Sequence, residues 1–215
     1  MTRKYYLLGA LLVAAALLAT LVAYPRLPEV VPTHWGWKGQ VNGYSPKWAL
    51  LVTGPGLMGA VVLLFRVLPW LSPRRWEVDS FRSTYLYIMV VILGLLAACQ
   101  ALVLWVGLGH RLDVRRAVAG AMCVLFALLG NVLGKVRRNF YIGVRTPWSL
   151  ASERVWNATH RVAAKTFVLS ALIGLALTAL GVDSRLILGL LLGGVLVPVV
   201  YSLALYKQLE RSGQL

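Results

Sequence analysis

The chain has 215 residues, a formal net charge of +15 and 59% hydrophobic residues, and its mean hydropathy is +0.74. Soluble domains are about half apolar, so this composition favours an integral membrane protein. The basic excess does not indicate nucleic-acid binding, because Lys and Arg lie in short segments between apolar runs rather than on one folded face. Cys99 and Cys123 lie inside apolar runs, which predicts buried thiols, no disulfide framework and no metal cluster.

Six apolar runs are long enough to cross the hydrocarbon core of a bilayer, which takes about 20 helical residues. The first run follows Arg3 and Lys4 and has some features of a signal peptide. Its apolar length exceeds a signal core of about 7–15 residues, so we expect a membrane anchor. We place the spans near residues 5–24, 49–67, 84–108, 117–133, 162–180 and 186–206.

These runs predict an all-α integral membrane protein with six transmembrane helices. Residues 1–70 form an N-terminal two-helix unit, and an ordered cap loop at residues 25–48 connects its helices. Residues 71–215 form a four-helix unit that contains a long polar segment at residues 135–165.

The basic residues predict the orientation, because Lys and Arg accumulate in cytoplasmic connections. The connections on the side of the two termini hold 14 of them, Arg74 and Arg75 included, against 7 on the other side. We therefore predict an N-in/C-in topology. The first loop is then extracellular and the fourth loop, which is the long polar segment, is cytoplasmic.

Few polar side chains lie inside the predicted spans, and none of them is acidic or a histidine. A proton-coupled transporter normally keeps such a group near the midplane, so ion-coupled transport is not indicated. Polar groups at depth either join helices by hydrogen bonds or line a transport pathway, and the first role is favoured. The groups are Gln100, Asn131, Thr178 and Ser202.

The cap loop combines turn-forming and aromatic residues. Three prolines, at positions 25, 28 and 32, exclude a continuous helix, and the Asn42–Gly43 pair suits a tight turn, so we expect a small cap or hairpin. The aromatic residues either lie at headgroup level or form a surface that captures an extracellular ligand. No second ligand has suitable spacing for a metal site at His34. The candidate ligand-binding residues, centred on His34 and Trp35, are His34, Trp35, Trp37, Gly39, Asn42, Gly43 and Tyr44.

The segment at residues 135–165 lacks helical periodicity at its start. Thr146 precedes a proline and is expected to be extended. Ser149 or Ser152 then caps a helix that continues through His160 into the fifth span. On this helix Glu153, Asn157, His160 and Ala164 share one face, and Arg154, Arg161 and Lys165 form a basic stripe beside it.

Two compatible interpretations of these faces remain open. In the first, Arg145 and Glu153 or His160 lock the segment against the helix bundle through buried hydrogen bonds. In the second, the faces are presented to a cytoplasmic partner or to lipid phosphates. A catalytic Glu–His pair is not indicated, because no nucleophile elbow, zinc motif, phosphate-binding glycine loop or paired acid accompanies it. We therefore expect no enzyme activity, no catalytic residue and no cofactor.

Two stretches of the chain resemble known motifs, in the order in which one family carries them. The polar segment resembles the signature of the SdpI family of bacterial membrane proteins, and the cap loop resembles the domain of unknown function that commonly precedes it. Together the resemblances cover essentially the whole chain. The first rests on Asn139, Gly143, Arg145, Thr146, Pro147, Trp148, Ser149, Leu150, Ser152, Glu153, Val155, Trp156, Thr159, His160 and Arg161, and the second on Pro28, Pro32, His34, Trp35, Gly39, Asn42, Gly43, Tyr44 and Lys47.

The resemblance implies a multi-pass protein of the bacterial cytoplasmic membrane that confers immunity to a secreted, membrane-active peptide toxin. It also implies that the toxin is met near residues 34–44 and that a cytoplasmic repressor responds to residues 139–160, without direct contact to nucleic acid. The cytoplasmic candidates are Asn139, Gly143, Arg145, Thr146, Pro147, Trp148, Glu153, Trp156, Asn157 and His160.

Two other functions remain open at this point. The first is a transporter or lipid-handling membrane protein with a cavity between its helices. The second is an intramembrane enzyme, which would need Glu153 and His160 to converge with another polar group or a metal.

Overall fold

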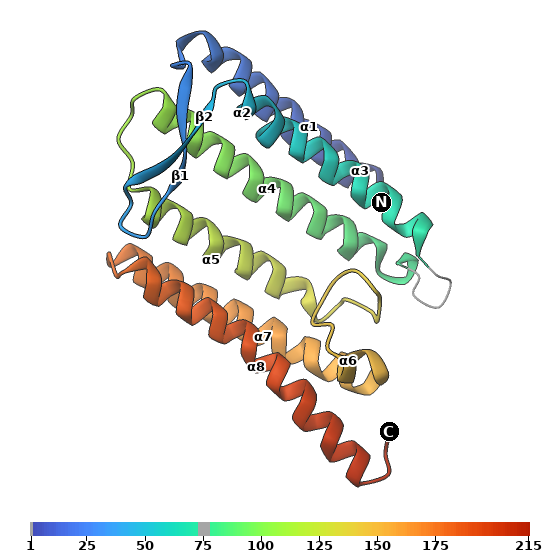
Figure 1. The fold of residues 1–215 in the computed structure, drawn as a ribbon. Coiled ribbons are helices and arrows are strands. Elements are labelled where there is room, and N and C mark those ends of the chain that lie inside the picture. The colour runs from blue at the N-terminus through green and yellow to red at the C-terminus, as the bar shows by residue number, and fades with distance from the viewer. Residues whose placement is uncertain (1, 73–77) are drawn as a thin grey trace. The chain divides into compact units, whose positions relative to one another are not determined.

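The computed structural model describes residues 2–72 and 78–215, and most of these residues are helical (Figure 1). Among the described residues, six helical segments are long and apolar enough to cross a membrane, and each overlaps one of the predicted runs. The prediction of a helical multi-pass membrane protein is confirmed. Arg74 and Arg75, which contributed to the predicted orientation, lie outside the described residues.

In chain order the elements are α1 (Thr2–Ala23), η1 (Tyr24–Arg26), β1 (Val30–Trp35), β2 (Val41–Pro46), α2 (Ala49–Leu51), η2 (Val52–Gly56), α3 (Leu57–Leu71), η4 (Asp79–Phe81), α4 (Arg82–Gly107), α5 (Val114–Leu133), α6 (Pro147–Ala151), α7 (Glu153–Ala179) and α8 (Ser184–Arg211).

The long helices expose apolar side chains that a soluble protein would bury. On α1, for example, Leu7, Leu11 and Leu18 are 60%, 56% and 64% exposed. A helix satisfies its backbone N–H and C=O groups internally, so it is stable in hydrocarbon with such side chains against lipid. The exposed leucine faces are therefore the surfaces that acyl chains cover.

The described chain divides into two compact units. The first contains Met1–Val67 and Leu86–Ala121, and the second contains Leu68–Tyr85 and Met122–Leu215. Most of α4, which the sequence analysis placed in a four-helix unit, packs with the first unit. The domain boundary predicted at residue 70 stays a prediction, because packing alone does not show which part folds independently.

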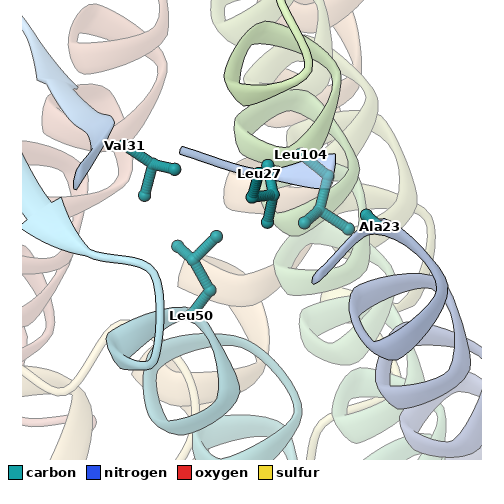
Figure 2. Packing of buried hydrophobic residues seen from close by; sticks show 5 residues of the cluster. All are labelled: Ala23, Leu27, Val31, Leu50 and Leu104. Atoms are coloured by element: carbon teal, nitrogen blue, oxygen red, sulfur yellow. The ribbon is translucent and has the colours of Figure 1, made fainter. Parts of the chain in front are cut away.

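In the first unit, β1 and β2 form an antiparallel hairpin next to the ends of three helices. Side chains from the hairpin, from α1 and its extension, from α2 and from α4 meet in a small apolar core (Figure 2). Burial of these apolar side chains fixes the hairpin on the helices. The core residues are Ala23, Leu27, Val31, Leu50 and Leu104.

The second span contains a π-helical turn, η2, which the sequence analysis did not predict. In a π-helix each N–H bonds to the carbonyl five residues earlier, and Pro55 has no N–H to offer Leu50. Gln100 Nε2 takes that place, because it donates to the Leu50 carbonyl at 3.2 Å and also to Thr20 Oγ1 at 2.9 Å. Gly54 permits this approach, since a Cβ there would overlap the Gln100 amide. The predicted helix-joining role of Gln100 is confirmed.

In the second unit, α7 and α8 pack through small residues. A Cβ at Gly194 would lie 2.6 Å from Ser170 Oγ, so only glycine allows this approach. Pro198 has no N–H for the carbonyl four residues earlier, which belongs to Gly194, and Thr166 Oγ1 donates to that carbonyl at 2.8 Å. Proline in a span is thus accommodated by a hydroxyl from the neighbouring helix, as lipid-embedded helices require. A helix-joining bond is not seen at Asn131, which is exposed on α5.

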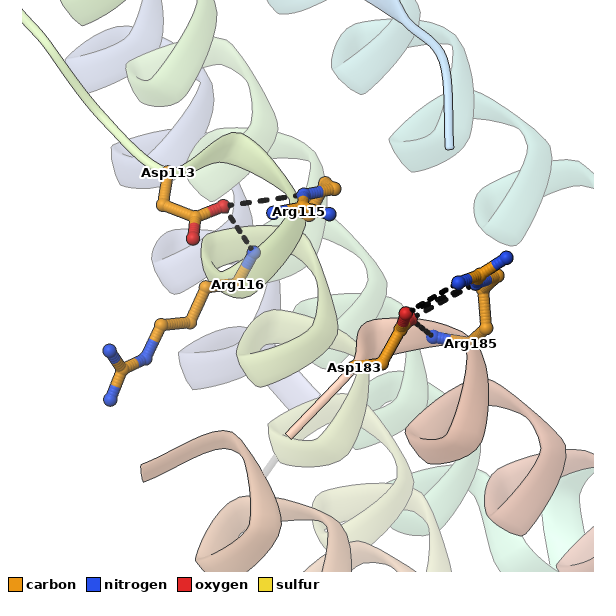
Figure 3. Close-up of polar contacts among 5 residues, drawn as sticks. All are labelled: Asp113, Arg115, Arg116, Asp183 and Arg185. Atoms are coloured by element: carbon orange, nitrogen blue, oxygen red, sulfur yellow. Dashed lines mark hydrogen bonds and ion pairs between the residues drawn. The ribbon is translucent and has the colours of Figure 1, made fainter. Parts of the chain in front are cut away.

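Two helices begin with an aspartate that accepts hydrogen bonds from the first turn (Figure 3). Before α5, Asp113 Oδ1 accepts from the Arg116 N–H at 3.2 Å and lies 3.8 Å from Arg115 Nε. Before α8, Asp183 accepts from the Arg185 N–H at 2.8 Å and pairs with the Arg185 guanidinium at 2.7 Å. These bonds occupy N–H groups that the first turn of a helix leaves unpaired, and they fix where each helix starts.

Candidate functional site

The hairpin, residues 30–46, is one of two ordered surfaces that lie outside the spans. Its turn falls at residues 37–39, where Gly36 N donates to the Gln40 carbonyl at 2.9 Å and Gly39 adopts a φ of +82°. The turn predicted at Asn42–Gly43 is therefore wrong, because both residues lie in β2. Glycine is needed at position 43 for a different reason, since a Cβ there would lie 2.8 Å from that of His34.

The predicted centre of the hairpin is a polar pair with aromatic residues around it. His34 Nδ1 and Asn42 Oδ1 are 2.5 Å apart, so the imidazole donates to the amide oxygen. Both residues are exposed, whereas Trp35 is half-buried. Trp37 and Tyr44 are 66% and 63% exposed. The hairpin thus brings the predicted residues together and presents two large aromatic side chains at its surface.

Ion pairs and close packing hold the hairpin in place. At its base Lys47 Nζ pairs with Glu29 at 2.9 Å and lies 5.0 Å from the centre of the Tyr24 ring. At its turn a Cβ on Gly39 would lie 3.1 Å from Arg115 Nε, so the turn rests against the start of α5. The exposed surface is therefore carried by a rigid support rather than by a free loop.

Asn139 organises the start of the second ordered surface, the signature segment at residues 135–165. Its side chain is fully buried. Oδ1 accepts from the N–H groups of Tyr141 and Ile142 at 2.7 and 2.8 Å, and Nδ2 donates to the carbonyls of Arg137 and Ile142 at 2.8 and 2.9 Å. All four hydrogen-bonding positions of the amide are used, so Asn139 shapes the loop and is not available to a partner.

His160 joins this loop to α7. Its Nε2 accepts from the Val144 N–H at 3.0 Å and its Nδ1 donates to the Trp156 carbonyl at 2.8 Å, which requires neutral imidazole with the proton on Nδ1. The ring stacks on the Trp156 indole with 4.0 Å between centroids, and the indole N–H donates to the Val136 carbonyl at 2.8 Å. Gly143 has a φ of +116°, and a Cβ there would overlap the imidazole.

Thr146 ties the segment to a second helix. Thr146 Oγ1 accepts from Ser149 N at 3.1 Å and Ser149 Oγ accepts from Thr146 N at 3.0 Å, which is a reciprocal cap at the start of α6. Thr146 Oγ1 also lies 2.9 Å from Ser202 Oγ on α8. The helix that runs through His160 does have Ser152 at its N-cap position, as predicted, although the Ser152 side chain makes no capping bond. The shorter helix α6, which was not predicted, is capped by Thr146.

The charged residues Arg145 and Glu153 are exposed and take no part in a buried contact between the segment and the helices. Arg145 is exposed and donates to the Phe140 carbonyl, and Glu153 is exposed at the first turn of α7. The predicted buried lock is therefore wrong for Arg145 and Glu153. Leaving both charges exposed avoids the desolvation that a buried ion pair requires. A buried hydrogen-bonded contact does hold the segment, but it is formed by His160 and backbone groups.

The remaining predicted residues divide between the interior and the surface. Trp156 is fully buried, Trp148 and Asn157 are half-buried, and Pro147 is exposed. The sequence analysis missed the Val136 carbonyl as a partner of Trp156. It also missed Thr159, whose buried hydroxyl has no hydrogen-bond partner among the described residues.

In this arrangement His160 positions backbone groups of the loop. Both ring nitrogens of His160 are occupied, so the imidazole has no free position from which to abstract a proton. Within residues 2–72 and 78–215, no group of three or more His, Cys, Asp or Glu side chains is placed to hold a metal ion.

Six apolar helices with an ordered hairpin in one connection and a hydrogen-bonded segment in another define a multi-pass membrane protein. Residues 135–202 match the SdpI/YfhL protein family, and residues 11–59 match a domain of unknown function, DUF1648. These matches relate the chain to the SdpI family by similarity, with this domain ahead of the family signature. It is 25% identical over 209 residues to Immunity protein SdpI of Bacillus subtilis (strain 168), covering 97% of each chain. No solved structure matches.

Proposed function

We propose that this protein confers immunity to a secreted, membrane-active peptide toxin. The observation that carries the proposal is the match over 97% of both chains to a protein named for immunity. Immunity of this kind needs no catalysis, because binding or blocking a peptide at the membrane is sufficient. The absence of a free base at His160 is consistent with such a role.

The hairpin is the proposed contact surface for the peptide. Trp37 and Tyr44 are exposed and offer large apolar area with few rotatable bonds, which suits recognition of an amphipathic peptide. His34 and Asn42 add a polar pair on the same hairpin. Because the hairpin is fixed on an apolar core and on Arg115, little ordering entropy is lost when a ligand binds.

Chain order supports a division of roles between the two ordered surfaces. Three of the six apolar helical segments lie between the hairpin and the signature segment, so full spanning by each places the two on opposite sides of the bilayer. The excess of Lys and Arg around the signature segment favours the cytoplasm for that side. We place the protein in the bacterial cytoplasmic membrane with the hairpin outside.

A relay to a cytoplasmic repressor is the finer part of the proposal. Peptide binding outside changes the inner surface only if the peptide binds two conformations with different affinity. The contacts that would change are the Thr146–Ser202 bond and the His160–Val144 bond, because they tie the segment to α8 and α7. Arg145 and the half-buried Trp148 are then the side chains that a repressor reaches.

Toxin challenge of bacteria that express the protein tests this function. We expect cells with the unmutated protein to survive at least one of a panel of secreted membrane-active peptides that kills cells without it. A Trp37→Ala/Tyr44→Ala double variant should lose most of that protection at equal abundance in the membrane, because it removes exposed contact area and no core contact.

The matched control is Lys38→Ala, since Lys38 is an exposed neighbour in the same turn. It should protect as the unmutated protein does. Protection against no peptide in the panel would refute immunity. Full protection by the double variant would refute the hairpin as the contact surface while leaving immunity in place.

A further inference from the structure

Two exposed apolar stripes in the second unit each end in a lysine. On α7 the stripe contains Leu172 and Leu169, which are 56% and 61% exposed, and it continues at helical spacing to Lys165 and Arg161, which are also exposed. Such a stripe passes from hydrocarbon to headgroup level within one helix face.

The second stripe lies on α5 and ends in the same way. It contains Val124 and Leu128, which are 47% and 40% exposed, and it leads through Asn131 to the exposed Lys135. Val124, Leu128 and Asn131 recur at intervals of three and four residues, so they share one face of α5, and Lys135 follows in the turn after the helix. Each stripe is thus apolar along the span and basic at its end.

Packing between α5 and α7 brings the two lysines to one level. A Cβ on Gly130 would lie 3.0 Å from the Ala164 carbonyl, and a Cβ on Gly134 would lie 3.9 Å from Ala164 Cβ. Gly134, in the turn that follows α5, therefore faces Ala164 of α7. Lys135 and Lys165 are the next residues in the chain after these two, so both lie at this end of the helix pair.

Three exposed basic side chains at this level, Lys135, Arg161 and Lys165, have no acidic partner within the described chain. The segment at residues 135–165 as a whole holds seven Lys and Arg residues against one acidic residue, Glu153. Exposed cations beside a span attract an anion from outside the chain.

We infer that α5 and α7 form a binding site for an anionic phospholipid, with its phosphate between Lys135 and Lys165 and its acyl chains along the leucine stripes. Lysine binds phosphate as a point charge, and both lysine stems can lie along apolar surface while the ammonium groups reach headgroup level. An acidic soluble protein fits less well, because the basic residues continue directly into exposed leucines that only hydrocarbon covers. Arg161 extends the site toward the aqueous side.

Retention of lipid by the full chain tests this site. The protein is reconstituted in nanodiscs containing phosphatidylcholine and phosphatidylglycerol, released, and analysed by native mass spectrometry. We expect preferential retention of phosphatidylglycerol. The Lys135→Gln/Lys165→Gln variant should weaken that preference about 25-fold, because each basic side chain near an anionic surface contributes about a factor of five.

Two further variants separate charge at the site from total charge and from folding. Lys135→Arg/Lys165→Arg keeps the charge and should keep the preference. Lys38→Gln/Lys207→Gln removes the same total charge elsewhere on exposed positions and should also keep it. Equal retention of both lipids by the unmutated protein, or loss of preference in the second control, would overturn the site.

Competition distinguishes the lipid from other anions. Retained phosphatidylglycerol should resist millimolar inorganic phosphate and soluble polyglutamate, because neither has acyl chains for the leucine stripes. Displacement by phosphate would show a free-anion site, and displacement by polyglutamate would show a site for acidic protein. Either result would overturn the inference.

Discussion

At the scale of single residues, the most distinctive side chains of the signature segment are buried and contact the segment itself. Asn139 and His160 satisfy backbone groups of the loop, and Trp156 fills the space between loop and helix. A partner therefore meets the exposed backbone and side chains that this network supports, such as Arg145. The network determines the shape of the surface, and the outward residues determine its chemistry.

Gly143 gives the sharpest residue-level prediction. Gly143→Ala should lower the free energy of unfolding in detergent by about 1–3 kcal/mol from backbone strain alone. A further loss is expected because the new Cβ overlaps the His160 ring, and both losses lower the melting temperature. Gly181→Ala is the matched control, since Gly181 has a φ of +76° but open space around it. Equal melting temperatures for the two variants would show that the His160 contact contributes nothing.

The sequence predicted which residues belong to the ordered segment better than it predicted which of them are buried and which are exposed. Residue types and spacing indicated an ordered segment and a helix running through His160, and both are present. They did not show that Arg145 would stay exposed while His160 became buried, because burial depends on α8 and on the loop backbone. In the hairpin, Gly39 and Gly43 were both expected at the site, yet which one formed the turn depended on strand register.

At the scale of elements, two spans each contain a proline, and both accommodate it by the same kind of contact. Pro55 and Pro198 each remove an N–H from a helix, and a side chain from another helix donates to the carbonyl left free. Gln100 donates to the carbonyl that Pro55 leaves free, and Thr166 donates to the carbonyl that Pro198 leaves free. Apolar runs predicted the existence of these spans, but not the π-turn or the donors, because each donor lies far from its acceptor in sequence.

Thr166→Val tests this arrangement with little change in side-chain shape. It should destabilise the protein by about 1 kcal/mol, because the Gly194 carbonyl then lacks a donor in a medium without water. Thr53→Val is the control, since Thr53 Oγ1 donates to the Ala49 carbonyl at 3.0 Å and the backbone N–H of Val52 also donates to that carbonyl. Chemical unfolding in mixed micelles measures both, and a larger loss for the control would contradict the argument.

At the scale of the whole molecule, the proposed function requires the two ordered surfaces to lie on opposite sides of the membrane. One surface carries exposed aromatic residues on a fixed hairpin, and the other carries a hydrogen-bonded loop among basic residues. Sensing on one side and response on the other become linked only through helices that contact the response surface, such as α8 at Ser202. Orientation is therefore the property on which both halves of the proposal depend.

Cysteine labelling measures this orientation directly. In a Cys99→Ala/Cys123→Ala background, single cysteines at Lys38→Cys and Arg145→Cys place one thiol on an exposed position of each surface. We expect a membrane-impermeant maleimide added to intact cells to label Lys38→Cys alone, because the excess of Lys and Arg favours a cytoplasmic signature segment. Arg145→Cys should react only after the membrane is permeabilised, which also serves as the control for thiol reactivity. Labelling of both positions in intact cells would place both surfaces outside, and a relay from an external peptide to a cytoplasmic repressor would then have no physical route.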